Sequence, residues 1–266
     1  QAQLERALDR GEITLEYQPV LNCAHGQIAG VEAVLRWNHP SAGQLPPHKF
    51  VPFIEHTATT GRIGEWAIRA TLEQIRDWHR QGVHIPVGIN LFAQQLRQKD
   101  LAATIEQSLQ ATDLSGPECG LELEVSELAA LEDLDRTAGI IESCRAIGVD
   151  VVLDDYGTGY ASPLHLRRLG AKHIKIDQSI IRGMIEEPAD NRLLRGIVAL
   201  ADTFGMGVVA TGVHTPALVP RLLDAGCERM QGLGLVGAMG GDTVVDWYRS
   251  FEPGELGYPA RHLPSD

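Results

Sequence analysis

Short runs of β-type residues alternate with longer helical runs along this 266-residue chain, and this alternation constrains the fold more than any other feature. The strand candidates are Ile13–Leu21, Ile28–Trp37, Ile85–Asn90, Leu121–Val125, Val151–Asp155, His173–Asp177, Gly207–Ala210 and Arg229–Leu233. The helical candidates are Phe50–Gln81 with a break near Gly61, Ala93–Thr112, Leu131–Ile147, Pro163–Leu169, Asn191–Phe204 and Pro216–Ala225. Alternation over about 250 residues predicts an α/β fold, a TIM-like (β/α)8 barrel.

The first connection departs from that alternation. Only Asn22–Gln27 separates the first two strand candidates, which is hairpin length and too short for a parallel crossover. The sequence therefore predicts one antiparallel strand in an otherwise parallel barrel. A doubly wound open sheet is the alternative.

Charge and cysteine usage limit the kinds of ligand and the cellular compartment that suit this chain. The chain carries 23 basic and 35 acidic residues, a net charge of −12, which argues against nucleic-acid polymers but allows a small anion held by local cations. The four cysteines have no paired spacing, which favours reduced thiols in a cytoplasmic protein. No apolar run approaches the roughly 20 residues of a membrane span. We expect residues 1–266 to form a single domain of a longer multidomain protein.

In a barrel of this kind the chemistry lies at the carboxyl ends of the strands. The polar residues there are Glu32, Arg36, Asn90, Glu124, Asp154, Asp155, Lys175, Thr211 and Gln231. Converging oxygen donors suit Mg²⁺ or Mn²⁺, and adjacent aspartates at a strand tip can bridge two metals about 3.5–4 Å apart for phosphodiester hydrolysis. A solvated, functionless rim is the alternative for this acidic cluster.

Short motifs in a fixed order resemble the EAL domain, the family that hydrolyses the bacterial second messenger cyclic di-GMP. They are Tyr17-Gln18-Pro19, Glu32-Ala33-Val34-Leu35-Arg36-Trp37, Ile89-Asn90-Leu91, Leu121–Glu127, Leu153–Gly159, Ile174–Asp177 and Gln231-Gly232. The resemblance implies that Glu32, Asn90, Glu124, Asp154 and Asp155 occupy metal-ligand positions. It also implies that Lys175 and Gln231 orient water or metal, and that Glu127 anchors the loop after the paired aspartates.

The chain departs from the family pattern where the general base is expected. The family's Ala-Glu-Gly-Val-Glu-Thr is here Ala210-Thr211-Gly212-Val213-His214-Thr215, and the name motif reads Glu-Ala-Val. Threonine cannot take a proton from water, and loss of a general base costs about 10²–10⁴ in rate. His214 lies beyond the strand tip and is better explained as a surface or helix-cap residue. We therefore expect a degenerate site with no catalytic residue, in which Lys175 is a remnant and the metal set is vestigial; Lys175 could instead pair with the aspartates.

A site that does not hydrolyse can still bind the dianionic nucleotide. Arg36 can hold a phosphate bidentately, or form an ordinary ion pair with Glu32 or Glu124. Glu65 can read a guanine, or be a first-turn acid favoured by the helix dipole, and Gln18 can contact ligand or only support a strand end. The expected ligand-binding set is Gln18, Glu32, Leu35, Arg36, Glu65, Asn90, Glu124, Asp154, Asp155, Lys175, Asp177 and Gln231.

Three functions follow. The leading one is an inactive EAL domain that binds cyclic di-GMP without a cofactor and signals to a protein. The pattern of losses resembles the FimX type, which implies a PilZ-type partner and control of type IV pili or motility. The alternatives are a weak phosphodiesterase that uses Mg²⁺ or Mn²⁺, and a ligand-free interaction scaffold.

Overall fold

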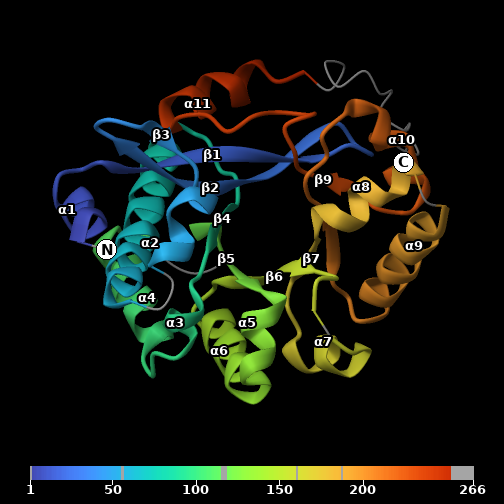
Figure 1. Cartoon of the computed structure of the whole chain (residues 1–266), viewed down its shortest axis with the longest axis horizontal. Helices are drawn as coiled ribbons and strands as arrows, with labels where there is room; N and C mark the ends of the chain where they lie inside the picture. Colours follow the sequence, from blue (N-terminus) through green and yellow to red (C-terminus); the bar gives the residue numbers. More distant parts are fainter. Residues whose placement is uncertain (1, 55–56, 115–118, 160, 187, 253–266) are drawn as a thin grey trace.

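A computed structural model describes residues 2–54, 57–114, 119–159, 161–186 and 188–252. Its sheet closes into a barrel of eight strands (Figure 1). In barrel order these are β1 (Ile13–Asn22), β9 (Arg229–Met230), β8 (Gly207–Ala210), β7 (His173–Ile176), β6 (Asp150–Tyr156), β5 (Leu121–Ser126), β4 (Val87–Asn90) and β2 (Gln27–His39). Pairing of β1 with β2 closes the ring, and β3 (Gly43–Leu45) extends the outer end of β2.

The predicted antiparallel strand is β1. It runs antiparallel to both its neighbours, β2 and β9, whereas the other neighbouring strands of the ring run parallel. The TIM-like barrel with one antiparallel strand is therefore confirmed. The hairpin between β1 and β2 is short, as the sequence predicts, because antiparallel neighbours need no crossover.

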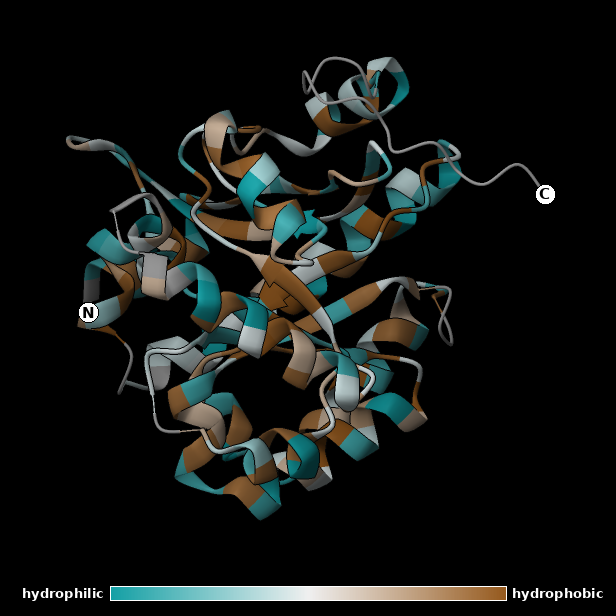
Figure 2. Cartoon of the chain, turned by 90° about the vertical axis from the view of Figure 1, so that its right-hand side faces the viewer, coloured by the Kyte–Doolittle hydropathy of each residue, from teal (hydrophilic) through white to brown (hydrophobic). Residues whose placement is uncertain are grey.

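Helices surround the barrel (Figure 1). They are α1 (Ala2–Asp9), α2 (Ala58–Arg80), α3 (Ala93–Leu96), α4 (Leu101–Ala111), α5 (Glu127–Glu132), α6 (Leu134–Ala146), α7 (Pro163–Leu169), α8 (Gln178–Glu186), α9 (Pro188–Thr203), α10 (Val219–Asp224) and α11 (Gly241–Ser250). The central strands are largely hydrophobic, and the helices carry polar and apolar stripes (Figure 2). The apolar stripes of the helices therefore pack against the barrel.

The helix predicted over Phe50–Gln81 is only partly correct. Two 3₁₀ turns, η1 (Pro47–Lys49) and η2 (Val51–Phe53), precede α2, because prolines 46, 47 and 52 cannot continue an α-helix. No break occurs at Gly61, and α2 runs unbroken to Arg80. Helices α8 and α11 were not predicted, and Pro216–Ala225 divides into η4 (Pro216–Leu218) and α10.

The buried core is continuous through the barrel and its helices. Trp78, Phe50 and Leu72 are among its largest fully buried side chains. All four cysteines are free and buried. In the described part of the chain, no helix combines the length and the apolar character that crossing a bilayer requires.

Candidate functional site

A lysine lies between two glutamates at the mouth of the barrel. Lys175 Nζ on β7 lies 2.6 Å from Glu32 Oε2 on β2 and 2.7 Å from Glu124 Oε2 on β5. Side chains at alternate strand positions point into the barrel, so three strands far apart in the sequence meet here. Only 4% of the Lys175 side chain is exposed, so solvent screens these ion pairs little.

Two side-chain amides also donate hydrogen bonds to the carboxylate of Glu32. Asn90 Nδ2 donates to Glu32 Oε1 at 2.7 Å, and Gln231 Nε2 donates to Glu32 Oε2 at 2.8 Å. Both oxygens of this carboxylate are therefore occupied by protein donors. Gln231 Nε2 also approaches Gln18 Oε1 at 3.5 Å, and Gln18 donates in turn to the carbonyl of Val236 at 3.4 Å.

Burial and charge act in opposite directions on these groups. Burial opposes the charge of Lys175, but Asp154, Glu124 and Glu32 together hold its pKa well above the ordinary value. Burial would raise the pKa of Glu32, yet Lys175 and the two amides lower it. Burial and then the charge of Glu32 raise the pKa of Glu124. The lysine is thus the cation that compensates this cluster.

The paired aspartates lie at the tip of β6. Consecutive strand residues normally face opposite sides, but Asp155 has φ +54° and the pairing of β6 with β7 shifts register between Leu153 and Tyr156. This irregularity lets both Asp154 and Asp155 line the mouth. Burial and neighbouring carboxylates raise the pKa of both, that of Asp155 to about 6.

Thr211 follows β8 and faces the same mouth. Its hydroxyl donates to the carbonyl of Ile176 at 2.7 Å, so this side chain is used in a structural hydrogen bond. A hydrogen bond of 3.0 Å from the Val213 N–H to the Gln231 carbonyl joins the segments that follow β8 and β9. A side chain at Gly232 would collide with the backbone of Val213, so only glycine allows this approach.

Two hollows open on the mouth. One of about 600 Å³ is lined on its polar side by Glu32, Asn90 and Asp155 and on its apolar side by residues that include Leu35 and Leu128. The other, of about 300 Å³, is lined by Gln18, Glu32, Asp154, Asp155, Lys175, Asp177, Gln178, Thr211, Gly212, Gln231, Gly232 and Leu233. Because both are lined by Glu32 and Asp155, the two hollows adjoin, and we call them together the mouth depression.

The structure therefore brings together most of the predicted site residues. Gln18, Glu32, Leu35, Asn90, Asp154, Asp155, Lys175, Asp177 and Gln231 line the mouth depression, and Glu124 lies beneath Lys175. Glu65 instead lines a separate hollow between α2 and α4. Arg36 pairs with Glu16, through Nε and Oε2 at 2.7 Å, rather than with Glu32 or Glu124.

Glu127 fastens the loop after the aspartates. Its carboxylate accepts the backbone N–H groups of Gly157 at 2.8 Å, Gly159 at 3.1 Å and Ala161 at 2.7 Å. Three such bonds from one buried carboxylate hold the loop to the start of α5.

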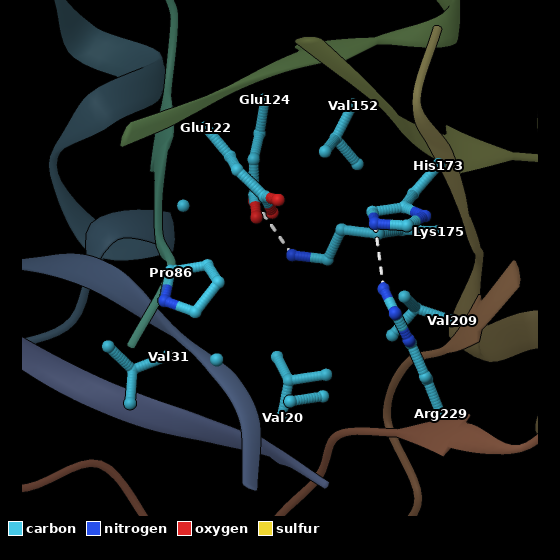
Figure 3. A pocket seen from close by; sticks show the side chains of 13 residues that line it. Val20, Val31, Pro86, Glu122, Glu124, Val152, His173, Lys175, Val209 and Arg229 are labelled. Carbon is cyan, nitrogen blue, oxygen red and sulfur yellow. Dashed lines mark hydrogen bonds and ion pairs between the residues drawn. The ribbon is translucent and has the colours of Figure 1, made fainter. Parts of the chain in front are cut away.

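Sequence reasoning missed a polar layer at the other end of the barrel (Figure 3). There Arg229 Nη1 lies 2.7 Å from His173 Nε2, and Glu122 points into the same small cavity of about 30 Å³. Glu122 and His173 stand two positions before Glu124 and Lys175 on the same strands, and Arg229 stands two positions before Gln231, which directly follows β9. The period of two along the strands could have identified them.

The mouth, as the side chains are arranged, does not fit a divalent cation. In the described residues no three His, Cys, Asp or Glu side chains are placed to share one metal ion. The ammonium of Lys175 contacts the two glutamates that the family pattern assigns to metal, and the glutamate expected at position 211 is a threonine.

Comparison with known proteins identifies the family. Residues 1–236 match the EAL domain. The bifunctional diguanylate cyclase/cyclic di-GMP phosphodiesterase MucR of Pseudomonas aeruginosa is 37% identical over 86% of this chain and 33% of its own length. The cyclic di-GMP phosphodiesterase NbdA of the same organism is 34% identical over 86% of this chain and 29% of its own. This chain thus spans about a third of the length of these relatives.

Solved structures agree. The phosphodiesterase PaMucR in complex with c-di-GMP has a TM-score of 0.87 and 36% identity, covering 91% of this chain and 98% of that one. The FimX EAL domain of Pseudomonas aeruginosa bound to c-di-GMP has a TM-score of 0.80 at 20% identity, covering 90% and 95%, and shows the shared fold alone. The chain belongs to the EAL domain family.

Proposed function

We propose that this domain is a receptor that binds cyclic di-GMP without hydrolysing it. The proposal rests on which side chains occupy the centre where hydrolysis would be expected. Thr211 stands where the family pattern has its general base, and its hydroxyl donates a hydrogen bond to a backbone carbonyl. Lys175 lies between Glu32 and Glu124 and pairs with both. No group at position 211 can accept a proton from water, which removes the general-base contribution.

The mouth depression suits an elongated dianion with two flat bases. Its larger hollow has an apolar wall for a base, and its smaller hollow has amide and lysine donors. Arg36 would supply a bidentate phosphate contact. Binding would leave Lys175 in place and need no metal, because the lysine already provides a cation between the two buried glutamates.

We assign the receptor to the cytoplasm, where its four free, buried thiols would stay reduced. A signalling partner would read the occupied mouth. A PilZ-type protein and a role in type IV pili or motility are the specific form of this proposal, resting on the loss of the position-211 glutamate. Pull-down of a PilZ protein by the wild-type domain, only with cyclic di-GMP present, tests that form.

A calorimetric titration of cyclic di-GMP into the domain in EDTA, followed by chromatography of the recovered nucleotide, tests the receptor. Micromolar or tighter binding with intact nucleotide is expected. Binding or cleavage only after Mg²⁺ or Mn²⁺ is restored would contradict metal-independent binding. No heat under either condition would favour a scaffold.

The similarity to MucR and NbdA favours a weak phosphodiesterase as the second candidate. Glu32, Glu124, Asp154 and Asp155 are retained, so Thr211→Glu should then raise metal-dependent hydrolysis sharply. If this variant still shows no hydrolysis with Mn²⁺, the missing glutamate at position 211 is not the sole cause of inactivity. Thr215→Glu, on the same loop but outside the mouth lining, is the matched control.

A further inference from the structure

Outside the cluster around Lys175, the most informative contact is an ion pair that links strand β1 to strand β2. It lies where these two paired strands, the β1–β2 ribbon, extend past the mouth. Arg36 Nε donates to Glu16 Oε2 at 2.7 Å, and Arg36 Nη1 donates to the Leu35 carbonyl at 3.2 Å. The two side chains are only 16% and 23% exposed, so this pair is better shielded from solvent than an ordinary surface ion pair.

The register of the ribbon fixes where each charge stands. Gln18 is opposite Glu32, Glu16 is opposite Val34, and Thr14 is opposite Arg36. Residues two apart on a strand share a face, so Glu16 and Arg36 stand on the face that carries Gln18 and Glu32. Arg36 is four residues beyond Glu32, about 13 Å along the strand, and Glu16 lies about half as far out.

Glu16 therefore stands between the arginine and the mouth depression, whose lining includes Val34. A phosphate that approaches Arg36 from the mouth meets the Glu16 carboxylate first. It must displace a charge-assisted hydrogen bond, and it is repelled by a like charge.

We propose that Glu16 is an internal competitor of the ligand phosphate for Arg36, and so a residue that lowers the affinity of the domain for cyclic di-GMP. Glu16 does this through the arginine, by holding its guanidinium on the ribbon until an anion replaces the carboxylate. The inference rests on the proposed function, because it assumes that Arg36 takes a phosphate of the ligand.

The test is a set of calorimetric titrations of cyclic di-GMP in EDTA with wild type, Glu16→Gln, Arg36→Ala and the double variant. We expect Glu16→Gln to tighten the dissociation constant by about three- to tenfold. In the Arg36→Ala background the same change should give a clearly smaller gain, limited to the relief of direct like-charge repulsion. Glu16→Asp, which shortens the competitor by one methylene, should give a smaller gain and serves if Glu16→Gln does not fold.

Asp135→Asn is the matched control. It removes the carboxylate from another arginine pair, Arg168 Nη2 to Asp135 Oδ1 at 3.1 Å, and changes the net charge equally at a site that does not line the mouth. Its affinity should equal that of wild type.

Weaker binding by Glu16→Gln would overturn the inference, because Glu16 would then position Arg36 for the phosphate. An unchanged affinity, or a gain that is equally large in the Arg36→Ala background, would also overturn it. In those cases the wild-type domain still binds and the receptor stands. If neither wild type nor any folded variant binds, the receptor itself fails and the inference with it.

Discussion

Lys175 is the residue on which the electrostatics of the mouth depend. Replacement by methionine keeps the bulk of the side chain but leaves Glu32 and Glu124 buried without their cation. Removing one partner of a buried charge cluster costs about 3–5 kcal/mol. Urea denaturation of Lys175→Met at neutral pH should show a loss of that size in the free energy of unfolding.

Lys172 offers the control for that measurement. It also contacts two carboxylates, Glu122 Oε1 at 2.9 Å and Asp150 Oδ2 at 2.7 Å, but its side chain is 41% exposed. Lys172→Met should cost no more than about 1 kcal/mol. Equal losses in the two variants would mean that the mouth cluster is screened like a surface pair.

At this scale the sequence predicted which residues converge but not how they pair. The resemblance indicated Lys175 at the mouth, with the aspartates as its possible partners, and the structure joins it to the glutamates. Arg36 was expected to need a counter-charge, and its partner Glu16 was missed. Pairing across a hairpin depends on register, here altered by an irregularity between Val20 and Leu21, which composition does not encode.

The element that shapes the acidic side of the mouth is the end of β6 with the loop after it. Glu127→Ala removes the acceptor of three backbone N–H groups, those of Gly157, Gly159 and Ala161. We expect faster amide hydrogen exchange at these three positions, by roughly tenfold or more if about 1.4 kcal/mol of local stability is lost.

Glu132→Ala on the same short helix is the comparison. Glu132 pairs with Arg97 at 2.7 Å on the surface, away from the hydrogen bonds that hold the loop. Exchange at Gly157, Gly159 and Ala161 should stay at the wild-type rate. Unchanged exchange in Glu127→Ala would show that the loop holds its shape without the carboxylate.

Strands were predicted more closely than helices, for a physical reason. Buried parallel strands are continuous apolar runs bounded by turns, so seven of the eight candidates differ from their strands by at most two residues at either end, and only the candidate for β9 runs further, to Leu233. The helix ends depend on local contacts. Gly61 does not interrupt α2, and Gly64 lets the amide end of the Gln95 side chain of α3 lie close to the helix.

At the scale of the whole molecule, we expect the free energy of unfolding not to depend on metal, because Lys175 already pairs with Glu32 and Glu124 in the mouth. EDTA should leave the free energy of unfolding unchanged. Cyclic di-GMP at one hundred times its dissociation constant should raise it by about 2.7 kcal/mol, because only the folded barrel holds the site. Chemical denaturation with and without each additive measures both. A stability loss in EDTA would contradict a lysine-compensated mouth.

The polar layer at the opposite end of the barrel predicts acid sensitivity of the whole fold. Burial is the main cause that lowers the pKa of His173 to about 4; the charges of Arg229 and Lys172 act in the same direction, and those of Glu122 and Asp150 oppose them. An arginine always donates, so Nε2 of His173 accepts from Arg229 and the ring is neutral with its proton on Nδ1. Among the described residues, Nδ1 has no hydrogen-bond partner.

A folded-state pKa below the ordinary 6.5 means that the unfolded chain binds more protons between pH 6.5 and 4. Stability contributed by the neutral ring is therefore complete above pH 6.5 and is lost as pH falls toward 4, by up to about 3 kcal/mol. His173→Gln, which keeps a neutral acceptor for Arg229, should flatten this part of the pH profile of the unfolding free energy. His214→Gln, at an exposed histidine, should keep the wild-type slope. Parallel profiles for wild type and His173→Gln would show that His173 does not set this part of the slope.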